Sequence, residues 1–392
     1  MQRHDPKLRL STDGHAAVLR SLIPLFFYFV VAGIVTVMLG PLLPVFIRQW
    51  NIQDSQAGSL FVFNFAGQLC GALFAARNLR LSVVLGALFS AIGCAFMVRA
   101  SFSTAPYAFF LVGAGIGIGL TAGNIIAGTA IPALRGRLLA IVNIAWGIGA
   151  ISCPLLLHAF GSINVSLFLL ITSAVLIASA LFSIVLPPLI LEKPSTKHQP
   201  ARRLPLALPL LFFFTISMLL YIGIENSLGG WLPSYAVRIN PAIQASTVTL
   251  YFWIAELIGR LLLAVVVTRL GEPILYRICL VILLITTVLF CTLIHPSSGS
   301  LMTLTFLSAL SLAPLYPLMV SLLLARTGTH PQLGLLFSVI SLGGAALPWL
   351  TGVVSTRFHH LRAGLIVPTI AVMALLSLSG AITRKPTPSL ET

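Results

Sequence analysis

Long apolar runs follow one another along almost the whole chain, and only short polar segments separate them. A helix that crosses the hydrocarbon core of a bilayer needs about 20 mostly apolar residues. A transmembrane β-barrel is excluded, because its strands alternate apolar and polar residues and these runs do not. The pattern predicts twelve helical spans, at residues 21–48, 55–76, 82–101, 105–131, 138–160, 164–190, 207–237, 243–268, 273–295, 299–325, 332–356 and 362–383.

The longest interruption between apolar runs covers residues 191–206 and contains several prolines and four cations. Such a segment is typical of a linker. It divides the chain into an N-terminal tail (1–20), a six-helix bundle (21–190), the linker, a second six-helix bundle (207–383) and a C-terminal tail (384–392). We therefore expect an all-α membrane protein of two pseudo-symmetric six-helix bundles.

Short sequence matches at equivalent places in the two halves indicate an internal repeat. LLPVFIRQWN (42–51) parallels WLPSYAVRIN (231–240), and GQLCGALFAARNLR (67–80) parallels GRLLLAVVVTRLGE (259–272). CPLL (153–156) matches LPWL (347–350). Repeated halves are typical of carriers that bind a solute near the midplane of the membrane, between the two halves.

Few residues of the chain are charged, and most of the charged residues are basic. Only 8% of residues are charged, mean hydropathy is +1.04, and 23 lysines and arginines outnumber eight acids. With the N-terminus in the cytoplasm, 17 of the 23 cations face inward and five face outward, while Arg260 lies within a span. We interpret the excess as a topology signal rather than a nucleic-acid surface, and expect a multi-pass protein of the cell inner membrane with both termini cytoplasmic.

Several kinds of chemistry find no support in the sequence. The five cysteines are odd in number and form no CxxC, so neither a disulfide framework nor a metal site is indicated. The motifs HExxH and GxSxG are missing, so we expect no catalytic residues and no enzyme. We also expect no cofactor and a monomer.

Two acids, Glu225 and Glu256, lie within predicted spans, whereas the other six lie in loops or tails. A charge inside a membrane is costly, so it is expected to face a cavity or a partner. Protonation of such an acid can change as access alternates between the two sides. Both are therefore candidates for proton coupling. The alternatives are a carboxylate bound to Tyr221 for Glu225, and a self-contained ion pair with Arg260 for Glu256.

Polar and aromatic residues within the spans are candidates for solute binding. Trp253, Glu256 and Arg260 form a stripe on one face of span 8. The repeat places Asn64 over Glu256 and Gln68 over Arg260. Amides pair with hydroxyl groups, and aromatic rings stack on the apolar face of a sugar. The candidate solute-binding residues are Asn64, Gln68, Asn124, Asn143, Trp146, Tyr221, Trp231, Trp253 and Arg260.

Structural roles remain open for several of these positions. Hydrogen bonding between helices is the alternative for each amide. The interfacial aromatic belt is the alternative for Trp231, and we expect Tyr235 to belong to that belt. His158 is expected to be a packed, neutral side chain near the outer end of span 5.

The two six-span halves and the basic linker resemble the major facilitator superfamily. GALFAARNLR (71–80) is similar to the signature of that family between spans 2 and 3, with Ala76 where the family has an acid. Span 7 resembles the fucose/glucose permease branch through Tyr221, Gly223, Glu225, Gly229 and Trp231.

The resemblance implies a secondary carrier that moves a small polar solute, with a sugar favoured, by alternating access and proton symport. The expected partners are this small-molecule solute, the proton and the lipid bilayer. The alternative is a proton-driven exporter of drugs or metabolites, since GIGAISCPLL (147–156) resembles the glycine-proline motif of antiporters.

Overall fold

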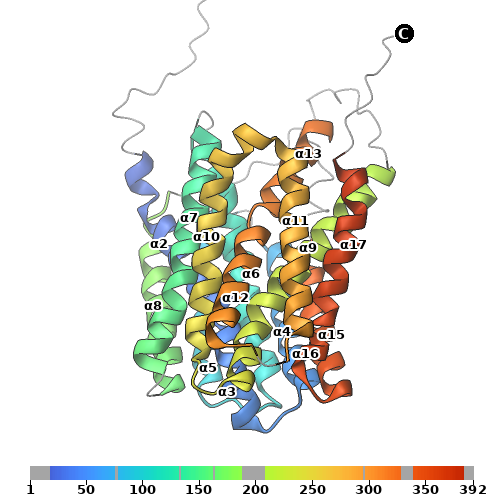
Figure 1. Ribbon diagram of the computed structural model, residues 1–392. Helices are drawn as coiled ribbons and strands as arrows, with labels where there is room; N and C mark the ends of the chain where they lie inside the picture. Colours follow the sequence, from blue (N-terminus) through green and yellow to red (C-terminus); the bar gives the residue numbers. More distant parts are fainter. Residues whose placement is uncertain are drawn as a thin grey trace, which may run out of the picture.

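The computed structural model describes residues 18–75, 78–131, 134–161, 164–187, 208–294, 296–327 and 339–383. Nearly all of these residues are helical, and long helices lie side by side in one elongated bundle (Figure 1). The start of α2 and the end of α17 lie at the same end of the bundle. The structure does not describe the predicted linker, residues 1–17 of the predicted N-terminal tail, the whole predicted C-terminal tail, the start of predicted span 11, or Ala76 and Arg77.

Helices cover all twelve predicted spans as far as these residues are described. The first half contains α2 (Ile23–Val37), α3 (Leu39–Trp50), α4 (Asp54–Leu73), α5 (Leu79–Met97), α6 (Ala105–Thr129), α7 (Arg135–Leu156), the π-helical turn η2 (Leu157–Gly161) and α8 (Val165–Ser183). The second half contains α9 (Leu208–Ile239), α10 (Ala245–Leu270), α11 (Glu272–Thr292), α12 (Ser298–Leu312), α13 (Leu315–Thr327), α15 (Leu342–Phe358), α16 (Leu361–Gly364) and α17 (Ile366–Ile382).

Two predicted spans are not single regular helices. Span 1 consists of α2 and α3, which meet at Met38, and span 10 consists of α12 and α13, which meet at Ala313 and Pro314. A proline removes a backbone N–H group and clashes with the preceding helical turn, which explains the second interruption. Pro314 and Pro317 in the sequence predict a kink in span 10, whereas the break at Met38 was not predicted from the sequence.

Ten of the described helical segments are long and apolar enough to cross a membrane. The segments α4 and α15 lie beside them, so the count of twelve stays a prediction. The side chains that the bundle exposes fit a lipid surface, because large apolar groups such as Leu181 (63% exposed) and Ile285 (54%) point outward. Water would not favour such a surface, whereas hydrocarbon does.

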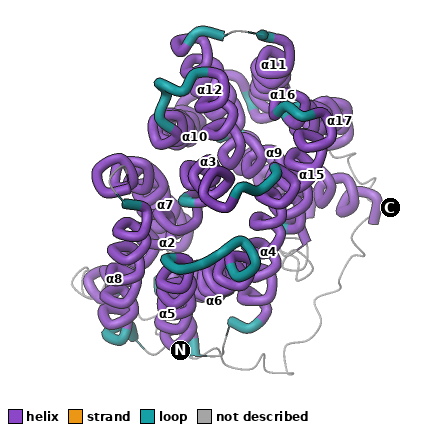
Figure 2. Tube along the Cα trace, turned by 90° about the horizontal axis from the view of Figure 1, so that it is seen from below, coloured by secondary structure: helices purple, strands orange, loops and turns teal. Residues whose placement is uncertain are grey.

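The helices of the two halves lie on opposite sides of the bundle when it is viewed end on (Figure 2). Within the first half, α4 and α5 pack against α6, and α2 packs against α7. Within the second half, α10 packs against α12, and α9 packs against α15 and α17. Contacts between the halves join α4 to α15, α3 to α9, and α7 to α10.

Glycines let neighbouring backbones touch inside each half. A Cβ atom at Gly113 of α6 would collide with the backbone oxygen of Asn64, and one at Gly67 of α4 would collide with that of Phe110. Gly259 of α10 lies in the same way against Leu310 of α12. Lipid is as apolar as the surface of a membrane helix, so the hydrophobic effect does not drive such helices together. They associate instead through van der Waals packing, which close contacts of this kind provide. The equivalent glycines therefore position α4 and α10 in similar ways.

The halves meet most closely at the predicted outer end, where α3 ends and α4 begins. Arg238 of α9 forms a bidentate ion pair with Asp54 of α4, with nitrogen–oxygen distances of 2.5 and 2.8 Å. Ser355 of α15 also donates to Asp54, at 2.5 Å, and the backbone N–H group of Ser55 donates to Thr356 at 2.8 Å. These contacts hold the outer ends of the two halves together.

A further contact between the halves involves His158 of η2. Its ring nitrogen Nδ1 donates to the side-chain oxygen of Gln244, at the start of α10, over 2.6 Å. The His158 side chain is exposed. The expectation of a packed side chain was therefore wrong, since the π-helical turn directs the ring toward the second half.

Replacing Gly113 by leucine should destabilise the protein, because the new side chain has to displace the backbone of α4. Overpacking of this kind costs about 1–3 kcal/mol or more. The measurement is the thermal unfolding curve of the purified protein. Gly380→Leu is the matched control, because a Cβ atom at that helical glycine meets nothing within 4 Å. Equal unfolding temperatures for the two variants would contradict the packing role of Gly113.

Candidate functional site

A cluster of three charged side chains lies between α9 and α10 of the second half. One guanidinium nitrogen (Nη2) of Arg260 on α10 lies 2.7 Å from Oε1 of Glu256 and 3.5 Å from Oε1 of Glu225 on α9. The hydroxyl group of Tyr221 donates to the same Glu225 oxygen over 3.0 Å. Both short contacts join residues four apart on one helix, which places the side chains on the same face. The longer contact joins two helices.

The three side chains differ in their access to the surroundings. The side chain of Glu256 is 2% exposed, that of Glu225 is 14% exposed and that of Arg260 is 32% exposed. One cation therefore faces two carboxylates, and the more buried carboxylate is its closer partner. The exposure of Arg260 leaves part of the cluster open to contact with another molecule.

Tryptophan side chains connect this cluster to the first half. The guanidinium carbon of Arg260 lies 5.7 Å from the ring centroid of Trp146 on α7, within the range of a cation–π interaction. The ring of Trp253 on α10 meets Trp146 edge to face, with centroids 5.5 Å apart. The indole N–H group of Trp146 makes a long hydrogen bond of 3.5 Å to Thr36 on α2. The cluster thus lies where the two halves meet.

Two residues of this region were not among the sequence-based candidates. Thr36 supports Trp146, and Tyr316 of α13 lies against Tyr221 with ring centroids 5.5 Å apart. Tyr316 follows the helix interruption at Pro314 by two residues, so the predicted kink was a signal that this part of span 10 is irregular. Thr36 gave the weaker signal of a single hydroxyl group in an apolar span.

Asn64 and Gln68 on α4 form a pair four residues apart on one helix, as Glu256 and Arg260 do on α10. The amide nitrogen of Gln68 donates to the side-chain oxygen of Asn64 over 3.1 Å, again between residues four apart. Asn64 is only 4% exposed and lies against Gly113 of α6. In this conformation the pair lies where α4 packs against α6.

The two remaining asparagines are exposed. Asn124 of α6 donates to the backbone oxygen of Leu120 over 2.9 Å, and Asn143 of α7 donates to that of Leu139 over 2.8 Å. Each amide therefore bonds to its own helix through its nitrogen, and neither lies deep in a helix interface. Both remain accessible to another molecule.

The aromatic residues near the outer end of α9 are buried. Trp231 is completely buried, and its indole N–H group donates to the backbone oxygen of Pro348 on α15 over 2.9 Å. Tyr235 is 2% exposed and donates to the backbone oxygen of Phe290. The expectation that Tyr235 lies in an interfacial belt was wrong, because α9 directs both rings into the protein. The Trp231 ring also lies beside Phe61 of α4, with centroids 6.4 Å apart, so Trp231 contacts the first half.

No group of three or more His, Cys, Asp and Glu side chains in the described part of the chain could hold a metal ion. The side chains of the charged cluster and the neighbouring tryptophans offer hydrogen bonding, ion pairing and aromatic stacking. These interactions bind a molecule and release it again without making or breaking its covalent bonds.

Known proteins with similar sequences cover nearly the whole chain. The glucose/mannose transporter GlcP of Bacillus subtilis (strain 168) is 26% identical over 390 residues, which cover 92% of this chain and 94% of that protein. Bypass of stop codon protein 6 of Saccharomyces cerevisiae is 25% identical over 377 residues, which cover 83% of this chain and 75% of that protein.

Solved structures of transporters share the fold. A POT family transporter in complex with a thioalcohol-conjugated peptide has a TM-score of 0.77 at 13% identity, covering 93% of this chain and 97% of its own. A bacterial homolog of the human lysosomal transporter Spinster, in an inward-facing and unoccupied conformation, has a TM-score of 0.74 at 16% identity, covering 95% and 99%.

The sequence pattern that defines the Major Facilitator Superfamily matches residues 25–332, which is more than half of the chain. The helical bundle and the transporter structures that resemble it agree with this match. The chain therefore belongs to the Major Facilitator Superfamily, and it is a transporter rather than an enzyme.

Proposed function

We propose that this transporter moves a small polar solute, with a sugar or a related polyol favoured, by alternating access and in symport with protons. The observation that supports the proposal best is the cluster of Glu225, Glu256 and Arg260, in which one partly exposed guanidinium faces two carboxylates beside Trp146 of the other half. Carriers of this kind bind their solute near the midplane, between the two halves.

Charge counting assigns different roles to the two acids. With both carboxylates ionised, the cluster carries one net negative charge, and the uptake of one proton makes it neutral. An intramembrane charge costs at least ~2.5–3.5 kcal/mol on insertion scales, so the cluster changes its access from one side to the other most readily when it is neutral. Glu256 is the closer partner of Arg260, which leaves the more exposed Glu225 as the group that exchanges the proton.

The groups around Arg260 suit a solute that carries hydroxyl groups. The guanidinium donates hydrogen bonds, the carboxylates accept them, and the rings of Trp146 and Trp253 offer faces or edges for the apolar side of a sugar ring. The buried Tyr221 hydroxyl donates to Glu225 and so holds that carboxylate in place. Asn124 and Asn143 are accessible partners on the first half, and the half-buried Gln68, which donates to Asn64, is a further partner on α4. The resemblance to a glucose/mannose transporter supports the same class of solute.

Alternating access requires that one end opens while the other closes. The contacts at the predicted outer end, with Asp54 bound to Arg238 and Ser355, close that end. Toward the other end of α4, Leu73 and Phe74 are 71% and 78% exposed. The arrangement therefore suits a carrier that is closed on the outside, with Trp231 between the closed end and the cluster.

The charge of the cluster also favours a second candidate function. The excess of one carboxylate over the guanidinium would attract a cationic solute, as in a proton-driven exporter of drugs or metabolites. Transport by inside-out vesicles distinguishes the two candidates. An exporter accumulates its solute when the vesicle interior is made acidic, whereas a symporter of the proposed kind does not.

The sequence supports a proposal for the membrane, the orientation and the domain organisation of this carrier. We propose that it is a monomer of the cell inner membrane with both termini in the cytoplasm, because this orientation places 17 of its 23 lysines and arginines inside. We also propose that residues 21–190 and 207–383 move as two domains joined by the linker at 191–206.

Glu225→Gln should abolish uphill, proton-driven uptake into proteoliposomes, because an amide cannot take up and release the coupling proton. Exchange of labelled solute across the membrane without a gradient should persist, because an amide still forms hydrogen bonds. Glu272→Gln is the control, since this carboxylate at the start of α11 binds Ser321 outside the cluster and should leave coupling intact. Unchanged uphill uptake by Glu225→Gln would reject the role of this residue.

Arg238→Gln should shift the protein toward arrangements that are open at the outer end. The partly exposed ion pair between Arg238 and Asp54 contributes about 1–2 kcal/mol to the closed arrangement. Its loss should therefore raise the ratio of open to closed protein roughly 5–30-fold. Distances between spin labels on the outer ends of α4 and α15 report this ratio. Arg357→Gln removes an exposed cation of α15 and should leave the distances unchanged. The same distances in both variants would contradict the proposed closure.

The solute itself is identified by its effect on stability. A ligand that binds the folded state raises the apparent unfolding temperature. Purified protein screened against sugars, polyols, organic acids and cationic drugs should be stabilised by members of the first two classes. Stabilisation by the drugs alone would favour the exporter.

A further inference from the structure

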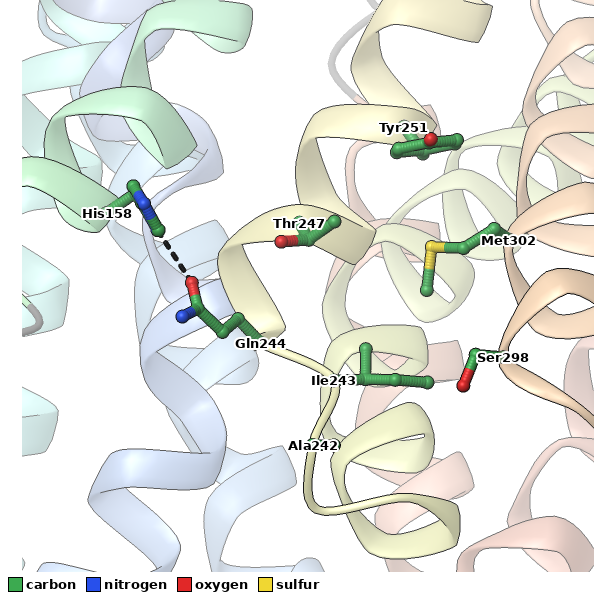
Figure 3. Close-up of a pocket in the computed structure, with 8 residues that line it drawn as sticks. All are labelled: His158, Ala242, Ile243, Gln244, Thr247, Tyr251, Ser298 and Met302. Carbon is green, nitrogen blue, oxygen red and sulfur yellow. Dashed lines mark hydrogen bonds between the residues drawn. The ribbon is translucent and has the colours of Figure 1, made fainter.

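A groove opens on the side of the bundle where the start of α10 faces the start of α12. Its outer part is a cavity of about 440 Å³ that also reaches His158 of η2 (Figure 3). A second cavity of about 470 Å³ continues along α12, and both share Tyr251, Ser298 and Met302. The two cavities therefore form one continuous groove, and none of its residues belongs to the charged cluster.

The groove has the length and the position of one membrane leaflet. Along α12 it runs from Ser298, the first residue of the helix, to Leu307. Nine residues of helix span about 14 Å, and half of a hydrocarbon core measures about 15 Å. Both helices belong to segments that are apolar enough to cross the membrane. If the first residue of α12, Ser298, lies at the edge of the bilayer, the groove ends near the middle of the bilayer.

The lining of the groove becomes more apolar from Ser298 toward Leu307 along α12. His158, Gln244, Thr247 and Ser298 give the first cavity, the mouth of the groove, most of its polar groups (Figure 3). The second cavity adds Phe306 and Leu307 farther along α12, with Thr303 as its further polar residue, so the apolar share of the lining rises. This order matches an amphiphile with its head at the membrane surface and its chain in the hydrocarbon.

The mouth suits a negatively charged head group. None of the lining residues carries a carboxylate. The hydroxyl groups of Thr247 and Ser298 can donate hydrogen bonds to phosphate oxygens. The N-termini of α10 and α12 both lie at this mouth, and their partial positive charge adds to the attraction.

We propose that this groove is a binding site for a phospholipid of the surrounding bilayer, with the phosphate at the mouth and one acyl chain along α12. The proposal requires only that the chain spans a membrane, so it does not depend on which solute is carried. A lipid bound there would contact η2 of the first half and both α10 and α12 of the second, beside the hydrogen bond from His158 to Gln244. It would therefore stabilise the closed outer end.

The test uses the full-length protein in a neutral detergent with three added probes. These are phosphatidylglycerol, a diacylglycerol with the same chains, and water-soluble glycerol phosphate. Native mass spectrometry counts bound molecules, and thermal unfolding measures their effect. Phosphatidylglycerol should bind and stabilise, the diacylglycerol should bind at least about tenfold more weakly because it lacks hydrogen bonds to a charged group, and glycerol phosphate should not bind.

Met302→Trp tests the apolar part, because the larger ring fills the groove. Met373→Trp is the matched control, since Met373 lies on α17 with 46% of its surface exposed and lines neither cavity. Binding of phosphatidylglycerol should be lost in the first variant and kept in the second. Ser298→Asp tests the mouth independently, because the added carboxylate repels the phosphate and should weaken binding at least about tenfold.

A photoreactive phosphatidylglycerol should label residues of α10 and α12 in the unaltered protein. Equal binding by the unaltered protein and both groove variants would overturn the proposal, because the lipid would then bind elsewhere. Equal binding of phosphatidylglycerol and diacylglycerol would overturn the assignment of the phosphate to the mouth. Absence of any bound lipid would overturn the site itself.

Discussion

The guanidinium of Arg260, shared between two carboxylates, is the interaction on which the site depends. A charge between membrane-spanning helices has to be paired, and Glu256 on the same helix provides the short contact of 2.7 Å. The second carboxylate, Glu225, lies 3.5 Å away on α9 and thereby fixes how α9 faces α10. Trp146 covers the guanidinium from the other half of the chain, so the pairing is complete only where the two halves meet.

Close contact between helix backbones allows the two halves to pack against each other. Gly40 of α3 lies against Gly229 of α9, and Gly58 of α4 lies against Trp349 of α15, so the halves approach each other without intervening side chains. Helices within a membrane gain little from hiding apolar surface, so packing and hydrogen bonds must hold them together. The ion pair of Asp54 and Arg238 adds a polar contact at the outer end, where water is available once the halves separate.

The sequence predicted those features that depend on neighbours along the chain. Hydropathy predicted helices where the structure has them. A spacing of four residues offered the pairing of Glu256 with Arg260 and of Glu225 with Tyr221 as alternatives to proton coupling, because both contacts depend on helix geometry alone. The contact from Arg260 to Glu225 and the burial of Tyr235 depend on how α9 is rotated against its neighbours. An aromatic residue near the end of a span has the same local pattern whether it packs or faces lipid, so Tyr235 was misplaced.

Rigid-body rocking would link the outer ion pair to the charged cluster. Arg238 and Arg260 both belong to the second half, while their partners Asp54 and Trp146 belong to the first. On α9, Glu225 and Arg238 are separated by 13 residues, or about 20 Å of helix. A rotation that separates the outer ends therefore moves Arg238 farther from its partner than it moves the cluster from Trp146. In such a rotation the outer ion pair would break first, and the cation–π contact would remain near the pivot while the outer end opens.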